Sequence, residues 1–401
     1  MRNNTQFITG LKALGAMMIV ISHLKMQFSG FTDLSWKLIT FPAYFSVLFV
    51  CISAFTISIS LDSKKNFNIY DYMKRRWIRL APVYYFSLFL GLFIKSFWLG
   101  WNYFTQTFPN LPFLVFFLNL DPIHPKSQSS ILGVEWMLPI MFWLYLLIPF
   151  LLFLLRKKFS FFVLLFALSI FLHFNSDVLT SYKGFGGFAW SLQFYIIMYT
   201  YTVFIYYLHS QTNCLLKIRR RLLLSSVNIL GILLSLTLII YYLNTNSERL
   251  YACLLIGLTI YLLWIKRYVL TFSFVRNGFI SGIINNLDIV ILGVILVKYM
   301  INLYYIKDPH IILTLWFVAL LIAGTFRPLS IRFLFENKYM HFLGIISFEI
   351  YLIHPLVIFI VERITPMEFS YLRFLLIIPL TIFVSYYLYK KIELPIYIRY
   401  A

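Results

Sequence analysis

The stretch GIISFEIYLIHP, residues 344–355, lies within an apolar run and nevertheless carries four polar side chains: Ser347, Glu349, Tyr351 and His354. Apolar runs of this length predict helices that cross a membrane. Helical spacing places Gly344 and three of the four polar residues on one face, with Glu349 nearly opposite. Ionisable groups inside a span are costly and are therefore functional candidates. Interhelical hydrogen bonding is the alternative explanation for the serine and the tyrosine.

The composition of the whole chain agrees with a membrane location for this stretch. Of the 401 residues, 61% are hydrophobic and 12% are charged, whereas soluble domains are about half apolar and about a quarter charged. The sequence therefore predicts an all-α fold, a polytopic membrane helix bundle of about 10–12 transmembrane helices. No linker or internal repeat divides it, so we expect a single integral-membrane domain over residues 1–401.

Three further features limit the possible partners. The formal net charge of +20 would suggest nucleic acid in a soluble protein. Here Lys and Arg gather between the spans and orient them in the lipid bilayer, so we expect no nucleic-acid partner. The cysteines, Cys51, Cys214 and Cys253, lack metal-ligand spacing, and we predict neither a metal site nor a disulfide framework. The N-terminal apolar segment has no cleavable signal pattern and is interpreted as an uncleaved first span.

Apolar runs between breakers predict about twelve spans, near residues 7–28, 37–61, 80–99, 131–155, 159–174, 185–209, 223–243, 250–265, 284–305, 310–325, 342–362 and 370–389. The short segments 159–174 and 310–325 could lie at the membrane interface instead. Basic residues gather in every even-numbered connection, for example Lys74, Arg75 and Arg76 in the second. By the positive-inside rule, we expect both termini in the cytoplasm.

The first predicted span carries two ionisable residues on one helical face. In GLKALGAMMIVISHLK, Lys12 and His23 are eleven residues apart, which is three helical turns and roughly 16 Å along the axis. Lys12 lies near the cytoplasmic end, where it could instead be snorkelling. His23 lies deeper, toward the outer side, and a packing role is the alternative to chemistry.

The second and third spans contribute a serine and two arginines. Ser53 lies in FVCISAF, residues 49–55, which is a weak signal by itself. Arg76 and Arg79 lie one turn apart where the third span begins, and we place Pro82 near that helix start, where its missing donor costs little. Two guanidinium groups on one face suit phosphate binding, whereas topology marking is the alternative.

Together these pieces resemble the membrane acyltransferase-3 family, the bacterial polysaccharide O-acetyltransferase type. The resemblance spans residues 10 to 395 and consists of six motifs in order: GLKALGAMMIVISHL, LFVCISAF, RRWIRLAP, EWMLPIMFWLYLLIP, GIISFEIYLIHP and IELP. Each motif is weak alone, but six in register are specific.

The chain also departs from the family pattern. Lys12 stands where the family has Arg, Ala54 replaces a Gly, and Phe348 replaces a Tyr. In the fourth motif, Met141 occupies the position where the family usually has a glutamate. Glu135, next to the tryptophan of that motif, is the nearest acid and is our candidate substitute.

The resemblance implies transfer of an acyl group, normally acetyl from cytosolic acetyl-CoA, to a hydroxyl of a cell-surface glycan such as O-antigen, capsule or exopolysaccharide. It places the protein in the bacterial inner membrane and implies no metal. His23 would be the general base, since a neutral imidazole can accept the hydroxyl proton, with the other catalytic candidates being Ser347, Tyr351, His354 and Glu135. The residues that would bind the donor are Lys12, Ser53, Arg76 and Arg79. Direct transfer and an acyl-histidine relay both remain open, as do succinyl-CoA and other acceptors.

Two other interpretations use the same residues. A transporter or lipid-linked glycan flippase also has about twelve spans with scattered polar groups, and a scaffold without chemistry would tolerate substitutions at His23 and Arg76. Near the chain's end, Glu393 and Pro395 lie beside Lys390 and Lys391. They either mark a helix stop with a solvated charge pair or, by the family resemblance, Glu393 forms a structural tie to an arginine. The proposed chemistry requires the helices bearing His23 and His354 to be neighbours.

Overall fold

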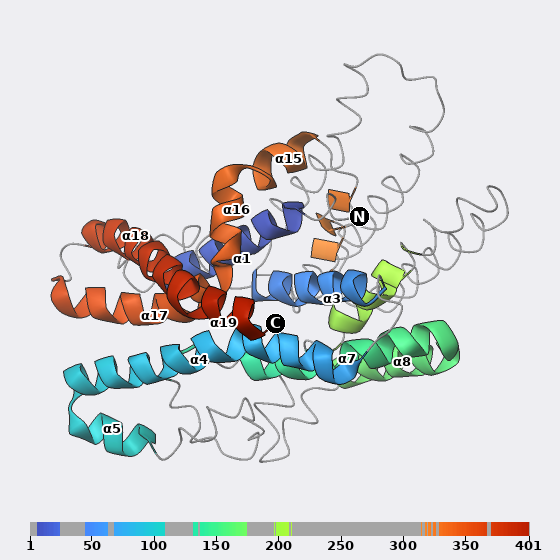
Figure 1. Cartoon of the computed structure of the whole chain (residues 1–401), viewed down its shortest axis with the longest axis horizontal. Coiled ribbons are helices and arrows are strands. Elements are labelled where there is room, and N and C mark those ends of the chain that lie inside the picture. The colour runs from blue at the N-terminus through green and yellow to red at the C-terminus, as the bar shows by residue number, and fades with distance from the viewer. Residues whose placement is uncertain are drawn as a thin grey trace.

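The computed structural model describes a helical protein (Figure 1). The described residues are 6–24, 45–62, 68–108, 131–134, 137–174, 196, 198–207, 210, 314, 317–318, 320–321, 324–325, 329–366 and 370–400. No strand occurs among them, which confirms the all-α prediction. The predicted spans 223–243, 250–265 and 284–305 lie outside the described residues.

The helices whose bounds are defined follow the chain from one terminus to the other. They are α1 (Gln6–Leu24), α3 (Ser46–Asp62), α4 (Ile69–Leu99), α5 (Trp101–Thr107), α7 (Met137–Lys157), α8 (Phe159–Phe174), α15 (Leu329–Phe335), α16 (Lys338–Ile345), α17 (Ser347–Ile364), α18 (Ser370–Leu388), the π-helical turn η8 (Tyr389–Glu393) and α19 (Leu394–Tyr400).

Several of these helices are suited to a bilayer. Within the described part of the chain, four are long and apolar enough to cross a membrane, namely Gln6–Leu24, Ile69–Leu99, Ile140–Lys157 and Leu372–Tyr400. Helices α16 and α17 add a fifth if they form one span, although they are bent by 70°. The chain is therefore a multi-pass membrane protein by the length and composition of its helices, and the count of about twelve spans stays a prediction.

Helix α4 corrects the predicted third span. It begins at Ile69, because the side chain of Asn68 accepts a hydrogen bond from the backbone N–H of Tyr70 at 2.9 Å and caps the helix. Arg76 therefore lies within the helix and not in a loop. Pro82 lies in the helix interior, so the expectation of a position near the helix start was wrong. Interior proline is tolerated in membrane helices, where neighbouring groups satisfy the freed carbonyls.

The outward face of α4 is aromatic. Phe86, Phe89, Phe93 and Phe97 recur at helical spacing and are all exposed. Such a stripe on a long apolar helix is the surface expected to face lipid.

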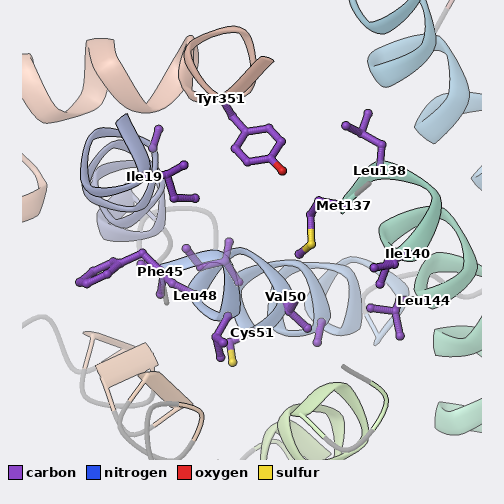
Figure 2. Close-up of a cluster of buried hydrophobic side chains, with 14 of the residues drawn as sticks. Ile19, Phe45, Leu48, Val50, Cys51, Met137, Leu138, Ile140, Leu144 and Tyr351 are labelled. Atoms are coloured by element: carbon purple, nitrogen blue, oxygen red, sulfur yellow. The ribbon is translucent and has the colours of Figure 1, made fainter. Parts of the chain in front are cut away.

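The core lies between α1, α3, α7 and α17. Figure 2 shows Leu48, Val50 and Cys51 of α3 below Ile19 of α1, with Leu144 of α7 beside them. All are at most 3% exposed. Burial of this cluster brings together segments from the two ends of the chain, and these are the segments that carry the histidines.

Helix α1 lies against α15, α16 and α17 at very close range. A Cβ atom built on Gly10 would meet the backbone carbonyl of Phe335, and one on Gly344 would meet the carbonyl of Thr9. Only glycine allows two helix backbones to approach this closely, as in small-residue interfaces of membrane helices. These contacts fix the relative position of α1 and the α16–α17 pair.

The bend between α16 and α17 falls at Ile346. Ser347, the first residue of α17, donates its hydroxyl hydrogen bond to the carbonyl of Gly344 at 2.9 Å. This bend was not predicted, and it separates Gly344 from the face that Tyr351 and His354 share on α17.

Candidate functional site

Two histidine side chains meet at one end of the bundle. His23, near the end of α1, places its Nδ1 atom 2.9 Å from Nε2 of His354 in α17, and the ring centroids are 4.9 Å apart. These residues are 331 positions apart in sequence. The expectation that the two histidine-bearing helices are neighbours is therefore confirmed.

The two rings differ in exposure and in their remaining contacts. The His354 side chain is 0% exposed, and its Nδ1 atom lies 3.0 Å from the backbone carbonyl oxygen of Ile350. His23 is exposed at the end of its helix. The pair thus joins a buried ring, held by the backbone of α17, to a ring that molecules outside the bundle can reach.

Tyr351 and Ser347 lie on the same helix as His354, and both hydroxyls donate to backbone carbonyls. The Tyr351 hydroxyl donates to the carbonyl of Val134 at 2.7 Å, and Figure 2 shows its ring pointing from α17 toward the start of α7. Its ring centroid lies 6.3 Å from that of His354. Tyr351 therefore ties the segment before α7 to α17, while Ser347 stabilises the bend.

A cluster of charged side chains lies near the opposite end of α1. The Arg79 Nε atom is 3.6 Å from the Glu393 Oε1 atom, which joins α4 to η8. Lys12 of α1 interacts electrostatically with Arg76, Arg79 and Glu393. Because a salt bridge with one half-exposed partner is worth about 1 kcal/mol or less, this contact determines orientation more than stability.

Arg76 is also held by aromatic rings. Its guanidinium lies over Tyr72 at 5.5 Å and over Tyr145 at 5.7 Å from the ring centroids. The Tyr72 hydroxyl in turn donates to the carbonyl of Tyr145 at 3.1 Å. These contacts limit the guanidinium to one region of space, since cation–π attraction adds to the covalent tether.

Glu393, in the terminal motif, forms a structural tie to an arginine. Its side chain is 8% exposed and pairs with Arg79, which confirms the structural tie. The helix does not stop at Pro395, which lies in α19. The interpretation as a helix stop with a solvated charge pair was wrong, because the chain continues into α19 and Glu393 pairs with Arg79 of α4.

Glu349 is a member of the charged cluster that sequence reasoning did not include. It is fully buried and interacts electrostatically with Glu393 and Arg79. The available signal was an acid in an apolar run. Glu349 lies nearly opposite the helical face of His354, so it was not grouped with the candidate site residues. Its place in the charged cluster depends on the packing of η8, which the sequence does not reveal.

The other predicted site residues are distributed as follows. Ser53 is buried in α3, and Met141, where the family pattern has a glutamate, packs against the core from α7. Glu135 lies outside the described residues. Over the described residues, no group of three or more His, Cys, Asp or Glu side chains could hold a metal ion.

The fold and the site together define a multi-helix membrane protein with a histidine pair toward one end of its first helix and a charge cluster toward the other. Residues 5–390 match the family model of an acyltransferase domain, Acyl_transf_3. The chain belongs to the acyltransferase-3 family, and this membership indicates acyltransferase activity. Searches of curated proteins and of solved structures gave no match.

Proposed function

We propose that this acyltransferase moves an acetyl or similar short acyl group from cytosolic acyl-CoA to a hydroxyl of a cell-surface glycan such as O-antigen, capsule or exopolysaccharide. The observation that carries the proposal is the contact between His23 and His354 at 2.9 Å, at the end of α1 away from Lys12. We place the protein in the bacterial inner membrane with both termini in the cytoplasm.

The charged cluster is suited to the donor. Coenzyme A carries several phosphate charges, and guanidinium and ammonium groups bind phosphate well. Lys12 and His23 are eleven residues apart on α1, which corresponds to roughly 16 Å. A thioester whose phosphates bind near Lys12, Arg76 and Arg79 carries its acyl group at the far end of an extended pantetheine arm. Such a donor requires a phosphate-binding region that is separate from the reacting histidine.

The histidine end is suited to the acceptor. His23 removes the proton from the glycan hydroxyl while the oxygen attacks the thioester carbonyl carbon. The carbon–sulfur bond breaks, coenzyme A leaves as a thiolate, and the proton returns to its sulfur. The products are the acylated glycan and free coenzyme A. In a relay, His23 would instead carry the acyl group before the hydroxyl attacks.

The remaining candidates support these two ends. Tyr351 and Ser347 already donate to backbone carbonyls, so we assign them the positioning of the site. Ser53 is proposed to contact the donor from α3. Glu135 is proposed to supply the acid that is absent at Met141.

The proposed function is tested by comparing cells with and without the protein. Mass analysis of surface glycans should show an added acyl mass only where the protein is present, and the purified protein with acyl-CoA and that glycan should release free thiol. Unchanged glycans together with transport of a lipid-linked glycan would contradict the proposal and favour a flippase.

A further inference from the structure

We propose that His354 is a positioning residue that sets the tautomer of His23, so that the Nε2 atom of His23 is the reacting nitrogen. This inference rests on the proposed function and deepens it. It narrows the role expected from sequence for His354, which was that of a catalytic candidate.

The first step is the tautomer of His354. A carbonyl oxygen can only accept a hydrogen bond, so the nitrogen 3.0 Å from the Ile350 carbonyl, Nδ1, must carry a proton. The Ile350 carbonyl therefore favours a proton on Nδ1.

The second step is the tautomer of His23, which the tautomer of His354 determines. A neutral imidazole with a proton on Nδ1 has its lone pair on Nε2. The Nε2 atom of His354 therefore accepts, and the Nδ1 atom of His23, 2.9 Å away, donates. A doubly protonated His354 would place a charge on a fully buried side chain within the membrane, which is costly.

The third step identifies the reacting atom. Once Nδ1 of His23 carries the proton, its lone pair is on Nε2. The ring of His354 is 0% exposed, whereas His23 is exposed. Substrates therefore meet His23, and His354 acts through it. In direct transfer the hydroxyl proton moves to Nε2 of His23 and then to the coenzyme A sulfur, and in a relay the same lone pair attacks the thioester carbon.

The tautomers can be measured without any reaction. Protein labelled with nitrogen-15 histidine is placed in lipid nanodiscs, and the ring couplings of His23 are assigned by comparison with His23→Ala. We expect His23 and His354 both to be protonated on Nδ1. A proton on Nε2 of His23 would overturn the inference, whatever the activity of the sample.

Two substitutions at His354 separate positioning from simple packing. In His354→Gln, the side-chain oxygen lies near the original Nε2 and can accept from His23. In His354→Asn, the shorter amide lies near the original Nδ1 and cannot reach His23. We expect kcat to fall less than about tenfold for Gln and about 100-fold or more for Asn, which is the loss of most of a general base's contribution. The KM for acyl-CoA should stay unchanged in both.

The controls keep the outcomes distinct. His341 is an exposed histidine on α16. The His341→Gln substitution should remove only the ring signals of His341 and leave the signals of His23 and His354, and the kinetics, unchanged. Equal activity of the Asn and Gln variants at position 354, with unchanged thermal unfolding, would overturn the positioning role. A wild-type protein that shows both Nδ1–H forms but acylates no glycan would support the tautomer assignment and contradict only the proposed function.

Discussion

The two ends of α1 hold their ionisable side chains by different means. At the His23 end, one hydrogen bond of 2.9 Å connects a ring to a fully buried partner, which a backbone carbonyl orients. At the Lys12 end, charges from α1, α4, α17 and η8 interact, and the Arg79 Nε and Glu393 Oε1 atoms are 3.6 Å apart. Hydrogen bonds depend steeply on geometry, whereas charge interactions fall off slowly with distance. Substitutions should therefore affect kcat at the first end and KM at the second.

The largest effect is expected at the histidine end. His23→Ala removes the proposed base, and acyl transfer should fall about 10²- to 10⁴-fold, the usual contribution of such a group. The measurement is thiol release from acyl-CoA in proteoliposomes with glycan present. His341→Ala serves as the matched control and should leave the rate unchanged. Retained transfer in His23→Ala would falsify the role of the base.

The second-largest effect is expected at the close contact between α1 and α16, where Gly344 meets Thr9. Gly344→Ala forces a methyl group against the carbonyl of Thr9, and overpacking of this kind costs about 1–3 kcal/mol. The midpoint of thermal unfolding in detergent should shift to lower temperature. We also expect kcat to fall and the KM for acyl-CoA to rise. Gly91→Ala is the control, because its new methyl group would meet the Leu132 side chain at 2.8 Å, and a side chain can move. If both variants unfold at the same temperature, α1 and α16 are not held by backbone contact.

A smaller effect is expected at the charged end. Arg79→Ala should raise the KM for acyl-CoA with little change in kcat, and it leaves Glu393, 8% exposed, without this partner. The pair itself is worth about 1 kcal/mol or less, since Arg79 is 42% exposed. Steady-state kinetics with varied acyl-CoA measure the change.

The double variant sharpens this result. Combining Arg79→Ala with Glu393→Gln removes the buried charge, so unfolding should return toward the wild-type temperature while KM stays high. Arg399→Ala, at an exposed position on α19, should change neither quantity. Recovery of KM in the double variant would show that Arg79 is structural and does not bind the donor.

The smallest effect is expected at Tyr351. Tyr351→Phe removes the hydrogen bond to the Val134 carbonyl, which is worth about 1 kcal/mol, and keeps the ring in the core. Thermal unfolding should decrease slightly and transfer should persist at a reduced rate. Tyr397→Phe, on the exposed surface of α19, should be neutral. Complete loss of transfer would contradict a supporting role and indicate direct substrate contact by the hydroxyl.

Much of this arrangement could be predicted from sequence because membrane helices obey simple rules. The apolar run 159–174 coincides with α8, and the expected neighbourhood of His23 and His354 is confirmed. The first success depends on the length of the apolar run, which a bilayer constrains strongly. The second follows from the chemistry that the family resemblance implies.

The errors have identifiable physical causes. The start of α4 was placed too late, although Asn68 and Asp71 form a recognisable helix start. The bend at Ile346 had no proline to mark it, and it depends on the approach of Gly344 to α1, which is a tertiary contact. The burial of Glu349 beside Glu393 likewise depends on how η8 packs. Pairwise contacts between distant segments leave no periodic signal in one sequence.

The π-helical turn η8 has a consequence for insertions and deletions. Its closing bond runs from the backbone N–H of Leu394 to the carbonyl of Tyr389, a spacing that accommodates one residue more than an α-helical turn. One residue corresponds to a rotation of about 100° around the helix axis. Loss of a single codon between positions 389 and 393 would therefore leave an ordinary α-helical turn, with the downstream side chains still facing α4. Insertion of one residue at this turn would rotate those side chains away from α4 and should be more harmful than the deletion.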